Sequence, residues 1–345
     1  MNVTVGASSK GVFVTMTVVH IGYPKAASST LQTGLFLHHN ELTNLGLYPT
    51  ANVGTASARC LGECASYSTD SRLPVLYDRL VHQDGILFDE NSTRALWKSI
   101  EDEYGQANPG KTLILSHEGI SSSRFANSEL VEKARRLKLL IPDARILIII
   151  RSQLEMLKSL YRDCPFDPRS IEYKPRPVSF SEWLDVDLSR RHFRLSSSLL
   201  FSRLVSVYER LFGEEEVLVL PLELLGRNRA AFCGELSSFL DIDERETARL
   251  LSAPADNTGI SRIGNQYRRA TRSLFPSGRL RAVLKRQLAP LDKRILDSLK
   301  KIGGSERIVS NARDLQKVKN LYSADNTLLS ERRCLGLREL DYPMS

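Results

Sequence analysis

Five apolar runs along the chain have the length and the flanking turn residues of β-strands. The strongest is residues 144–150, where Ala-Arg-Ile-Leu-Ile-Ile-Ile is apolar at nearly every position. A strand of this kind is buried on both faces, as in a parallel sheet that is covered on each side. The other runs are residues 18–21, 45–49, 111–116 and 216–220, of which 45–49 is a short, edge-like segment closed by proline.

The segments between these runs have apolar residues at helical spacing. Ala27, Leu31 and Leu35 recur at i, i+4 and i+8, and they predict a helix over about 26–40 with one buried stripe. Further helices are predicted over about 73–81, 93–104, 128–140, 153–163, 180–188, 195–212, 227–240 and 244–251, and beyond 257 the chain is polar, basic and mostly helical. Strands that alternate with helices indicate βαβ units. We therefore expect an α/β fold in three layers, with a central parallel β-sheet flanked by helices.

The composition is that of an ordinary globular protein, with 42% hydrophobic and 26% charged residues among 345. We interpret residues 1–345 as a single domain, with a core of about 17–262 and a basic helical C-terminal region of about 263–345. No apolar run approaches the roughly 20 residues of a transmembrane helix, so we expect no membrane span, signal peptide or anchor. Five scattered cysteines do not suggest a disulfide framework, and an odd number favours a reducing, cytoplasmic setting.

The net charge of +8 is unevenly distributed along the chain. Residues 262–301 contain twelve Lys or Arg and two Asp. One interpretation is contact with an anionic polymer or a membrane surface, which would place the protein at the periphery of a membrane. A solvated basic helix face is the other, and both remain open. No nucleic-acid partner is expected.

The clearest chemistry lies in the loop after the first strand, Gly22-Tyr23-Pro24-Lys25-Ala26-Ala27-Ser28-Ser29-Thr30. A strand leads into a turn, and a helix then opens near a lysine and three consecutive hydroxyl residues. Backbone N–H groups at a helix N-terminus bind anions, and a lysine adds a full charge. The loop is not a Walker A sequence, because Lys25 follows Gly22 by three residues and the next glycine is Gly34. The segment therefore predicts a phosphate-binding loop that holds its ligand differently from ATP.

Three of the predicted strands end in residues that can carry chemistry. Lys25 follows the first strand, His117 and Glu118 follow the third, and Arg151 follows the fourth. Ligands of parallel α/β sheets bind beyond the carboxyl ends of the strands. We therefore expect these groups at one edge of the sheet, with a phosphate as the partner of Arg151. An ion pair with Glu155 is the alternative for that guanidinium.

These residues resemble the PAPS-dependent sulfotransferase family, and in particular its bacterial, carbohydrate-sulfotransferase-like members. That family moves a sulfonate group from 3′-phosphoadenosine 5′-phosphosulfate (PAPS) to an acceptor, and the resemblance implies its P-loop-like fold. Residues 22–31 are similar to the family's 5′-phosphosulfate loop, although Ala27 stands where glycine is common. In that family an arginine at the end of a strand and a serine eight residues later bind the 3′-phosphate. Arg151 and Ser159 have this spacing, and Tyr161 follows them. Weaker similarities lie at Leu47-Tyr48-Pro49, at Pro221-Leu222-Glu223 (whose glutamate is usually structural), and at Asn326, Leu340 and Tyr342-Pro343.

The resemblance implies roles for individual residues. Lys25 would stabilise the charge of the leaving phosphate, which makes it catalytic as well as ligand-binding. The acceptor hydroxyl must lose a proton, and we favour Glu118 as its base because Ser116-His117-Glu118-Gly119 is similar to the pattern of glycan-directed members. His117 remains a rival, and strand alternation would send the two side chains to opposite faces. The implied PAPS-binding set is Lys25, Ala26, Ala27, Ser28, Ser29, Thr30, Arg151, Ser159 and, from its position and charge, Arg262.

The first hypothesis for function is therefore a sulfotransferase that uses PAPS, without a metal, to modify a hydroxyl of a saccharide or glycolipid. A P-loop-type nucleotide kinase is the second hypothesis, and the missing Gly-Lys-Ser/Thr sequence disfavours it. A non-catalytic nucleotide-binding protein of the same fold is the third. The presence of Lys25 together with a candidate base argues against it.

Two further groups could suggest metal ligands. Cys60 and Cys64 lack a second pair at zinc spacing, and we interpret them as buried free thiols. His38 and His39 are adjacent residues that cannot face the same way on a helix, and we interpret them as a solvated helix end.

Overall fold

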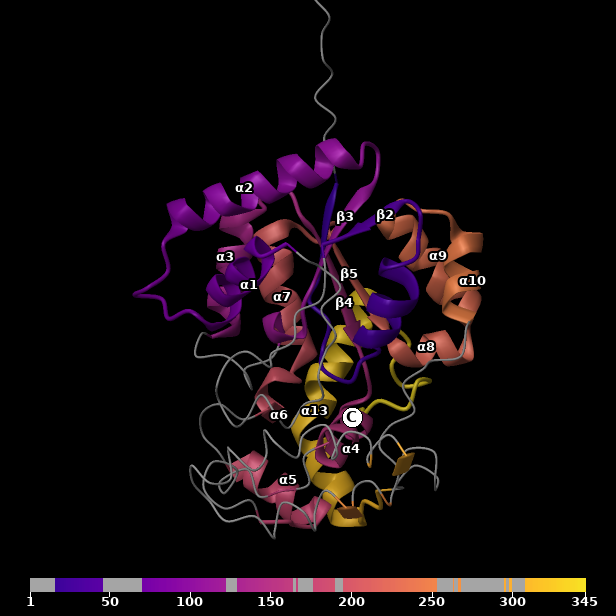
Figure 1. Cartoon of the computed structure of the whole chain (residues 1–345). Coiled ribbons are helices and arrows are strands. Elements are labelled where there is room, and N and C mark those ends of the chain that lie inside the picture. The colour runs from indigo at the N-terminus through magenta and orange to yellow at the C-terminus, as the bar shows by residue number, and fades with distance from the viewer. Residues whose placement is uncertain are drawn as a thin grey trace, which may run out of the picture.

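The computed structural model describes residues 16–45, 70–121, 129–163, 166, 176–189, 195–252, 263, 266–267, 295, 298–299 and 308–345. Within them lies a five-stranded sheet with helices on both faces (Figure 1). Its strands are β1 (Thr17–His20), β2 (Leu42–Asn44), β3 (Thr112–Ser116), β4 (Arg145–Ile150) and β5 (Val217–Pro221). Every neighbouring pair is parallel, in the order β2-β3-β1-β4-β5. The prediction of an α/β fold with a central parallel sheet is confirmed.

The central strands are buried on both faces, as their apolar runs predict. Residues 146–150 of β4 each have 0% exposure. Val19 of β1 lies opposite Leu115 of β3 on one side and Ile146 of β4 on the other. Because β1 is the middle strand, the loop that follows it emerges between the carboxyl ends of β3 and β4.

The edge strand begins ahead of the predicted segment 45–49. Leu42 of β2 pairs with Thr112, and the Leu45 N–H donates to the Ile114 carbonyl at 3.0 Å, which extends the contact beyond the strand. Leu42 and Leu45 are the buried positions. An edge strand is hydrogen-bonded on one side only, so a short mixed sequence is enough to form it and the apolar pattern marks it poorly. Residues 46–49 lie outside the described part of the chain.

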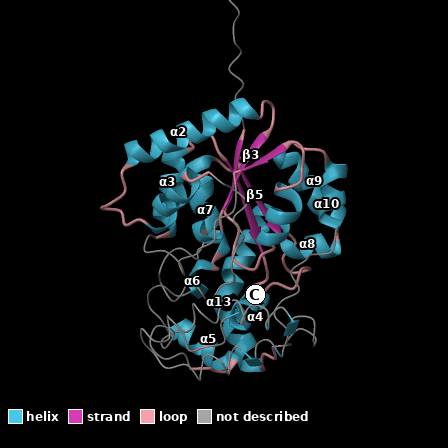
Figure 2. Cartoon of the chain, viewed as in Figure 1, coloured by secondary structure: helices cyan, strands magenta, loops and turns pink. Residues whose placement is uncertain are grey.

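Two helical layers cover the sheet, as Figure 2 shows by secondary structure. One layer contains α1 (Arg72–Tyr77), η4 (Asp78–His82), α2 (Glu90–Ala107), α3 (Leu130–Leu140) and α7 (Phe201–Phe212). The other contains η1 (Thr30–Phe36), α8 (Leu222–Arg227), α9 (Arg229–Leu240) and α10 (Glu244–Ser252). The remaining helices lie toward the carboxyl ends of the strands (Figure 1): η5 (Glu118–Ile120), α4 (Gln153–Asp163), α5 (Phe180–Ser189), α6 (Leu195–Ser198) and α13 (Ala312–Arg333).

The helices differ from their predicted bounds where the backbone leaves helical geometry. The helix predicted over 26–40 is the shorter η1, a π-type helix, because Lys25 and Ala27 have φ values of 71° and 56°, which no right-handed helix includes. The segment predicted over 195–212 is two helices, α6 and α7, since Leu200 has a non-helical ψ of 81°. Helix α8 was not predicted.

The C-terminal helix α13 ties the end of the chain to helix α4. Its start is fixed by a capping box in which the Asn311 side chain accepts from the Asp314 N–H and Asp314 accepts from the Asn311 N–H. Its fully buried Asn326 exchanges two hydrogen bonds with Gln153, at 2.7 and 3.0 Å, and also donates to the Pro343 carbonyl at 2.9 Å. The last residues of the chain are thereby fastened near the start of α4.

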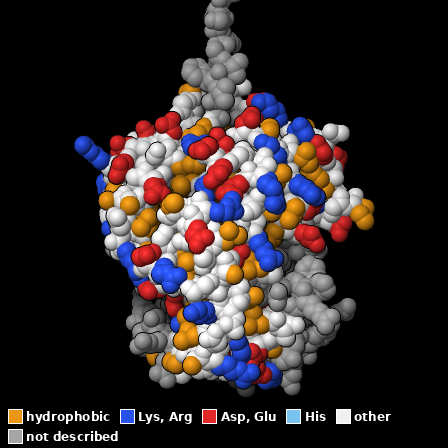
Figure 3. Space-filling model, turned by 180° about the vertical axis from the view of Figure 1, so that it is seen from behind, with side chains coloured by type: hydrophobic (Ala, Val, Ile, Leu, Met, Phe, Trp, Pro, Cys, Tyr) orange, Lys and Arg blue, Asp and Glu red, His pale blue; other side chains and the backbone are white. Residues whose placement is uncertain are grey.

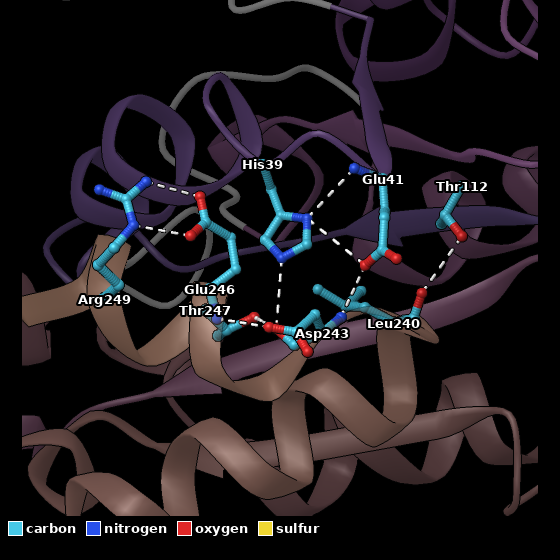
Figure 4. A network of polar contacts seen from close by, with 8 residues as sticks. All are labelled: His39, Glu41, Thr112, Leu240, Asp243, Glu246, Thr247 and Arg249. Carbon is cyan, nitrogen blue, oxygen red and sulfur yellow. Dashed lines mark hydrogen bonds and ion pairs between the residues drawn. The ribbon is translucent and has the colours of Figure 1, made fainter.

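A polar network joins the turn after η1 to the start of α10, as Figure 4 shows. His39 Nε2 donates to the Asp243 carbonyl at 3.4 Å, and Glu41 accepts the Asp243 N–H at 2.7 Å. His39 is 3% exposed, whereas His38 is exposed. The prediction of a solvated helix end is therefore wrong for His39, because α10 packs over it. In the described part of the chain no cluster of three His, Cys, Asp or Glu has the geometry of a metal site.

The surface shows no segregation of charge on the face drawn in Figure 3, where acidic and basic side chains are interspersed. Most of the basic segment 262–301, with Arg262, lies outside the described residues, as do Cys60 and Cys64. Among the helices that the structure describes, none combines the length and the apolar character needed to cross a bilayer.

Candidate active site at the carboxyl edge of the sheet

The loop after β1 has a backbone shaped for close contact with a ligand. Lys25 and Ala27 have positive φ values of 71° and 56°. The left-handed region is mildly strained for residues with a side chain, and such strain clusters at ligand-binding sites. The φ of Ala27 also explains why glycine would suit this position. The loop is anchored by Tyr23, which is fully buried and donates through its hydroxyl to the Ser198 carbonyl at 2.9 Å.

The helix that follows the loop presents backbone N–H groups to the same edge. Its first hydrogen bond runs from the Leu31 N–H to the Ala27 carbonyl at 3.0 Å. The N–H groups of Ser28, Ser29 and Thr30 come before that bond, and such groups have no intrahelical acceptor. The hydroxyl of Ser28 is buried and donates to the Tyr23 carbonyl at 3.0 Å. We therefore expect Ser28 to contact a ligand through its N–H, and Ser29 and Thr30, which are half-buried, through hydroxyls as well.

Arg151 connects the fourth strand to this loop. It directly follows β4, and its Nη1 donates to the Lys25 carbonyl oxygen at 2.9 Å. Glu155, its alternative partner, instead pairs with Lys158 at 3.0 Å. Ser159 lies half-buried on α4, the helix that Arg151 precedes. The loop lysine and the strand-end arginine therefore lie at one edge of the sheet.

His117 and Glu118 lie in the turn η5 after β3, and the turn separates their environments. His117 is 7% exposed, and its Nδ1 accepts the Gly119 N–H at 2.9 Å, so any proton of the neutral ring is on Nε2. Burial, followed by the charges of the nearby His82 and Lys133, lowers the pKa of His117 to about 3. Glu118, in the first turn of η5, is half-buried. The extended strand geometry ends at His117, so strict alternation does not decide where Glu118 points.

Comparisons with known proteins add likenesses to solved structures. The chain matches no protein-family model and no curated protein. It is similar to a sulfotransferase from Alicyclobacillus acidocaldarius, at 15% identity and a TM-score of 0.40, over 85% of this chain and 96% of that chain. It is also similar to a sulfotransferase domain from a Synechococcus olefin synthase, at 14% identity and a TM-score of 0.40, over 92% and 94%. A third likeness is to a sulfotransferase domain from the curacin biosynthetic pathway, at 14% identity and a TM-score of 0.41, over 96% of this chain and 99% of that chain.

A buried polar chain lies directly behind the loop, and sequence reasoning missed it. Gln32 donates to the Ser116 hydroxyl at 2.8 Å, and the same hydroxyl lies 2.8 Å from His20 Nδ1. Burial lowers the pKa of His20 to about 3, so the ring is neutral. His20 and Ser116 are opposite each other on β1 and β3, and only knowledge of the strand register would have joined them.

A second set of contacts that sequence reasoning missed holds the backbone of Ser152, the residue after Arg151. Glu223 accepts the Ser152 N–H at 2.9 Å through one oxygen and the Tyr342 hydroxyl at 2.7 Å through the other. Burial, followed by the charge of Glu223, raises the pKa of Tyr342 well above its usual value, so the hydroxyl keeps its proton and donates. Both residues belong to sequence segments that resemble the sulfotransferase family, but their mutual contact was not predicted.

Gly22 is required by the packing of this loop. A Cβ at Gly22 would lie 2.4 Å from His20 Cε1 and 2.9 Å from Ser28 Oγ. We expect Gly22→Ala to destabilise the protein by about 1–3 kcal/mol, the usual range for overpacking, and to weaken anion binding by the loop. Thermal unfolding would measure the loss of stability, and titration with inorganic phosphate or sulfate would measure the loss of anion binding. Gly226→Ala is the control, because a Cβ there meets nothing within 4 Å. A Gly22→Ala variant with wild-type stability would contradict the packing argument.

Proposed function

We propose that this protein is a sulfotransferase that moves a sulfonate group from PAPS to an acceptor hydroxyl. The observation that carries the proposal is the hydrogen bond from Arg151 Nη1 to the Lys25 carbonyl, at 2.9 Å. It joins the Lys25 loop, which has the features of an anion site, to a second cationic group, the guanidinium of Arg151 at the end of the neighbouring strand β4. A nucleotide with charged groups at both its 5′ and 3′ ends suits that pair of positions, whereas ATP has phosphates at one end.

The residues at this edge fit PAPS. The left-handed backbone at Lys25 and Ala27 brings the start of the helix toward a ligand, and the N–H groups of residues 28–30 suit the 5′-phosphosulfate. Arg151 offers a planar guanidinium for the 3′-phosphate, with Ser159 on the following helix as its companion. Arg262 is proposed as a third group on the nucleotide from its charge and its place in the sequence.

The proposed mechanism gives one role to each of two side chains. PAPS, when bound, supplies a sulfonate whose bond to the phosphate oxygen breaks as a bond to the acceptor oxygen forms. Glu118 takes the proton of the acceptor hydroxyl. Lys25 stabilises the negative charge that develops on the leaving phosphate. His117 is less suited to be the base, because its Nδ1 is engaged by the Gly119 N–H and its pKa is about 3.

The acceptor is proposed from the resemblance of residues 116–119 to those of carbohydrate-directed sulfotransferases. On that basis it is a hydroxyl of a saccharide or a glycolipid. A cytoplasmic location, with the basic segment 262–301 in contact with an anionic polymer or a membrane surface, completes the proposal.

Binding of 3′-phosphoadenosine 5′-phosphate (PAP), the product, tests the proposal by calorimetry without magnesium. We expect Arg151→Met to weaken PAP binding by on the order of 10²-fold, because hydrogen bonds between charged groups contribute about 1.5–3 kcal/mol each. Arg145→Met is the matched control, since Arg145 begins the same strand at its other end and donates to the Phe239 carbonyl.

Three outcomes would count against the proposal. Equal PAP affinity in the wild type and Arg151→Met would remove Arg151 from the nucleotide site. Binding of ATP with magnesium in preference to PAP would favour a kinase. Tight PAP binding without sulfonate transfer to any member of an oligosaccharide panel would favour a non-catalytic nucleotide-binding protein.

A further inference from the structure

The turn that carries Glu118 is held to the sheet and to the loop at several points. The His117 N–H donates to the His20 carbonyl of β1 at 3.2 Å. At the other end of the turn, Ser121 Oγ lies 3.0 Å from the Gly22 carbonyl oxygen. Gly119, in the middle, packs so closely that a Cβ there would lie 2.7 Å from Val81 Cγ1. The turn is therefore fixed from β1, from the loop and from η4.

A fourth contact comes from a buried lysine that the proposed mechanism does not use. Lys133 of α3 is 1% exposed, and its Nζ donates to the Gly119 carbonyl at 2.7 Å. Burial, helped by the nearby Arg136, lowers the pKa of Lys133 to about 7. Burying an amine or ammonium group is unfavourable unless specific hydrogen bonds compensate. Both protonation states carry N–H groups, so the contact with Gly119 persists on either side of neutral pH.

We propose that Lys133 is a positioning residue for Glu118, and this inference rests on the proposed function. Its Nζ holds the carbonyl of the residue next to Glu118, which fixes the orientation of the turn in which that carboxylate stands. A general base acts only within hydrogen-bonding reach of the proton that it removes, and a displacement of about 1 Å can lower a rate by 10²-fold. Lys133 therefore acts on catalysis through the backbone, from a distance and without touching the nucleotide.

Arg136 supplies a matched control on the same helix. It is buried like Lys133, and its Nη1 also donates to backbone carbonyls, those of Arg79 at 2.9 Å and Gln83 at 2.7 Å. Those carbonyls belong to η4 and the residue after it, not to the turn of Glu118. Replacing either residue by methionine removes a buried donor of similar length, so both variants lose stability, but only one loses a direct hold on the turn.

The test compares Lys133→Met with Arg136→Met at temperatures below the unfolding of both. We expect Lys133→Met to lower kcat for sulfonate transfer by about 10- to 100-fold with PAP affinity unchanged. Hydrogen–deuterium exchange of the peptide over residues 117–121 should also be faster in Lys133→Met than in Arg136→Met, and this measurement needs no acceptor.

The outcomes that would contradict the role of Lys133 differ from the outcome that would contradict the proposed function. Equal exchange over residues 117–121 in the two variants would overturn it, whatever the wild type transfers. Equal losses of kcat would overturn it too, because the effect would then be a general loss of stability. Failure of the wild type to bind PAP would instead contradict the proposed function, while the exchange measurement would still report whether Lys133 holds the turn.

Discussion

Replacing Glu118 by glutamine is expected to lower kcat for sulfonate transfer by on the order of 10³-fold while PAP binds as in the wild type. Glutamine keeps the size of the side chain but cannot accept the proton of the acceptor hydroxyl, and general bases contribute about 10²–10⁴-fold. The measurement is transfer from PAPS to an oligosaccharide acceptor, with PAP affinity from calorimetry. The contacts that hold the turn at His117, Gly119 and Ser121 use the backbone or the side chains of other residues, so they should survive the substitution.

Glu155→Gln is the control for this substitution. Glu155 lies exposed on α4 and pairs with Lys158, so the same chemical change there should leave kcat unaltered. Near-normal turnover by Glu118→Gln would transfer the role of base to another group. His117→Gln would then be examined first, although the engaged Nδ1 of His117 and its pKa of about 3 make it a weak base.

The sheet was predictable from sequence because its central strands are buried on both faces. Burial removes polar residues from such strands, so residues 144–150 form an apolar run that few other structures could accommodate. The edge strand β2 has only Leu42 buried among its three residues, and its sequence carries no such signal. The burial of His39 was also missed, because the packing of α10 over this residue is a tertiary contact that no local sequence pattern encodes.

The placement of the candidate site residues followed from topology. Parallel strands bring their carboxyl ends to one edge, so the loop of Lys25, the pair His117-Glu118 and Arg151 were expected to be neighbours. The hydrogen bond between Arg151 and the Lys25 carbonyl is in accord with that expectation. The catalytic and binding roles of these residues stay predictions.

The supporting contacts of the site could not be read from the sequence. Lys133 meets Gly119, and Glu223 meets Tyr342, across separations that only the folded chain closes. Lys133 looks like an ordinary lysine in an amphipathic helix, and the family resemblance at Glu223 and at Tyr342 did not indicate that the two side chains meet. Their significance comes from burial and from the carbonyl, amide or carboxylate that each one meets, and these depend on helix orientation and strand register.

Replacing Lys25 by methionine is expected to lower kcat by on the order of 10³-fold and to weaken PAP binding by a smaller factor. A cation aimed at developing charge stabilises the transition state more than the ground state, and removal of one such donor costs about 10²–10³-fold in kcat. The nucleotide would still be held by the N–H groups of residues 28–30 and by Arg151. Methionine tolerates the left-handed φ of 71° as well as lysine does, since neither is β-branched.

Lys25→Arg separates charge from geometry. Arginine keeps the positive charge but spreads it over a wider, planar group. If Lys25 contributes a point charge at the leaving oxygen, Lys25→Arg should restore PAP affinity more fully than kcat. A loss of PAP affinity in Lys25→Met with kcat unchanged would show uniform binding and would remove Lys25 from the chemical step. Because Arg151 donates to the backbone carbonyl of Lys25, the nucleotide site should retain its backbone in both variants. The loss of kcat is then a direct measure of the contribution of Lys25 to the chemical step.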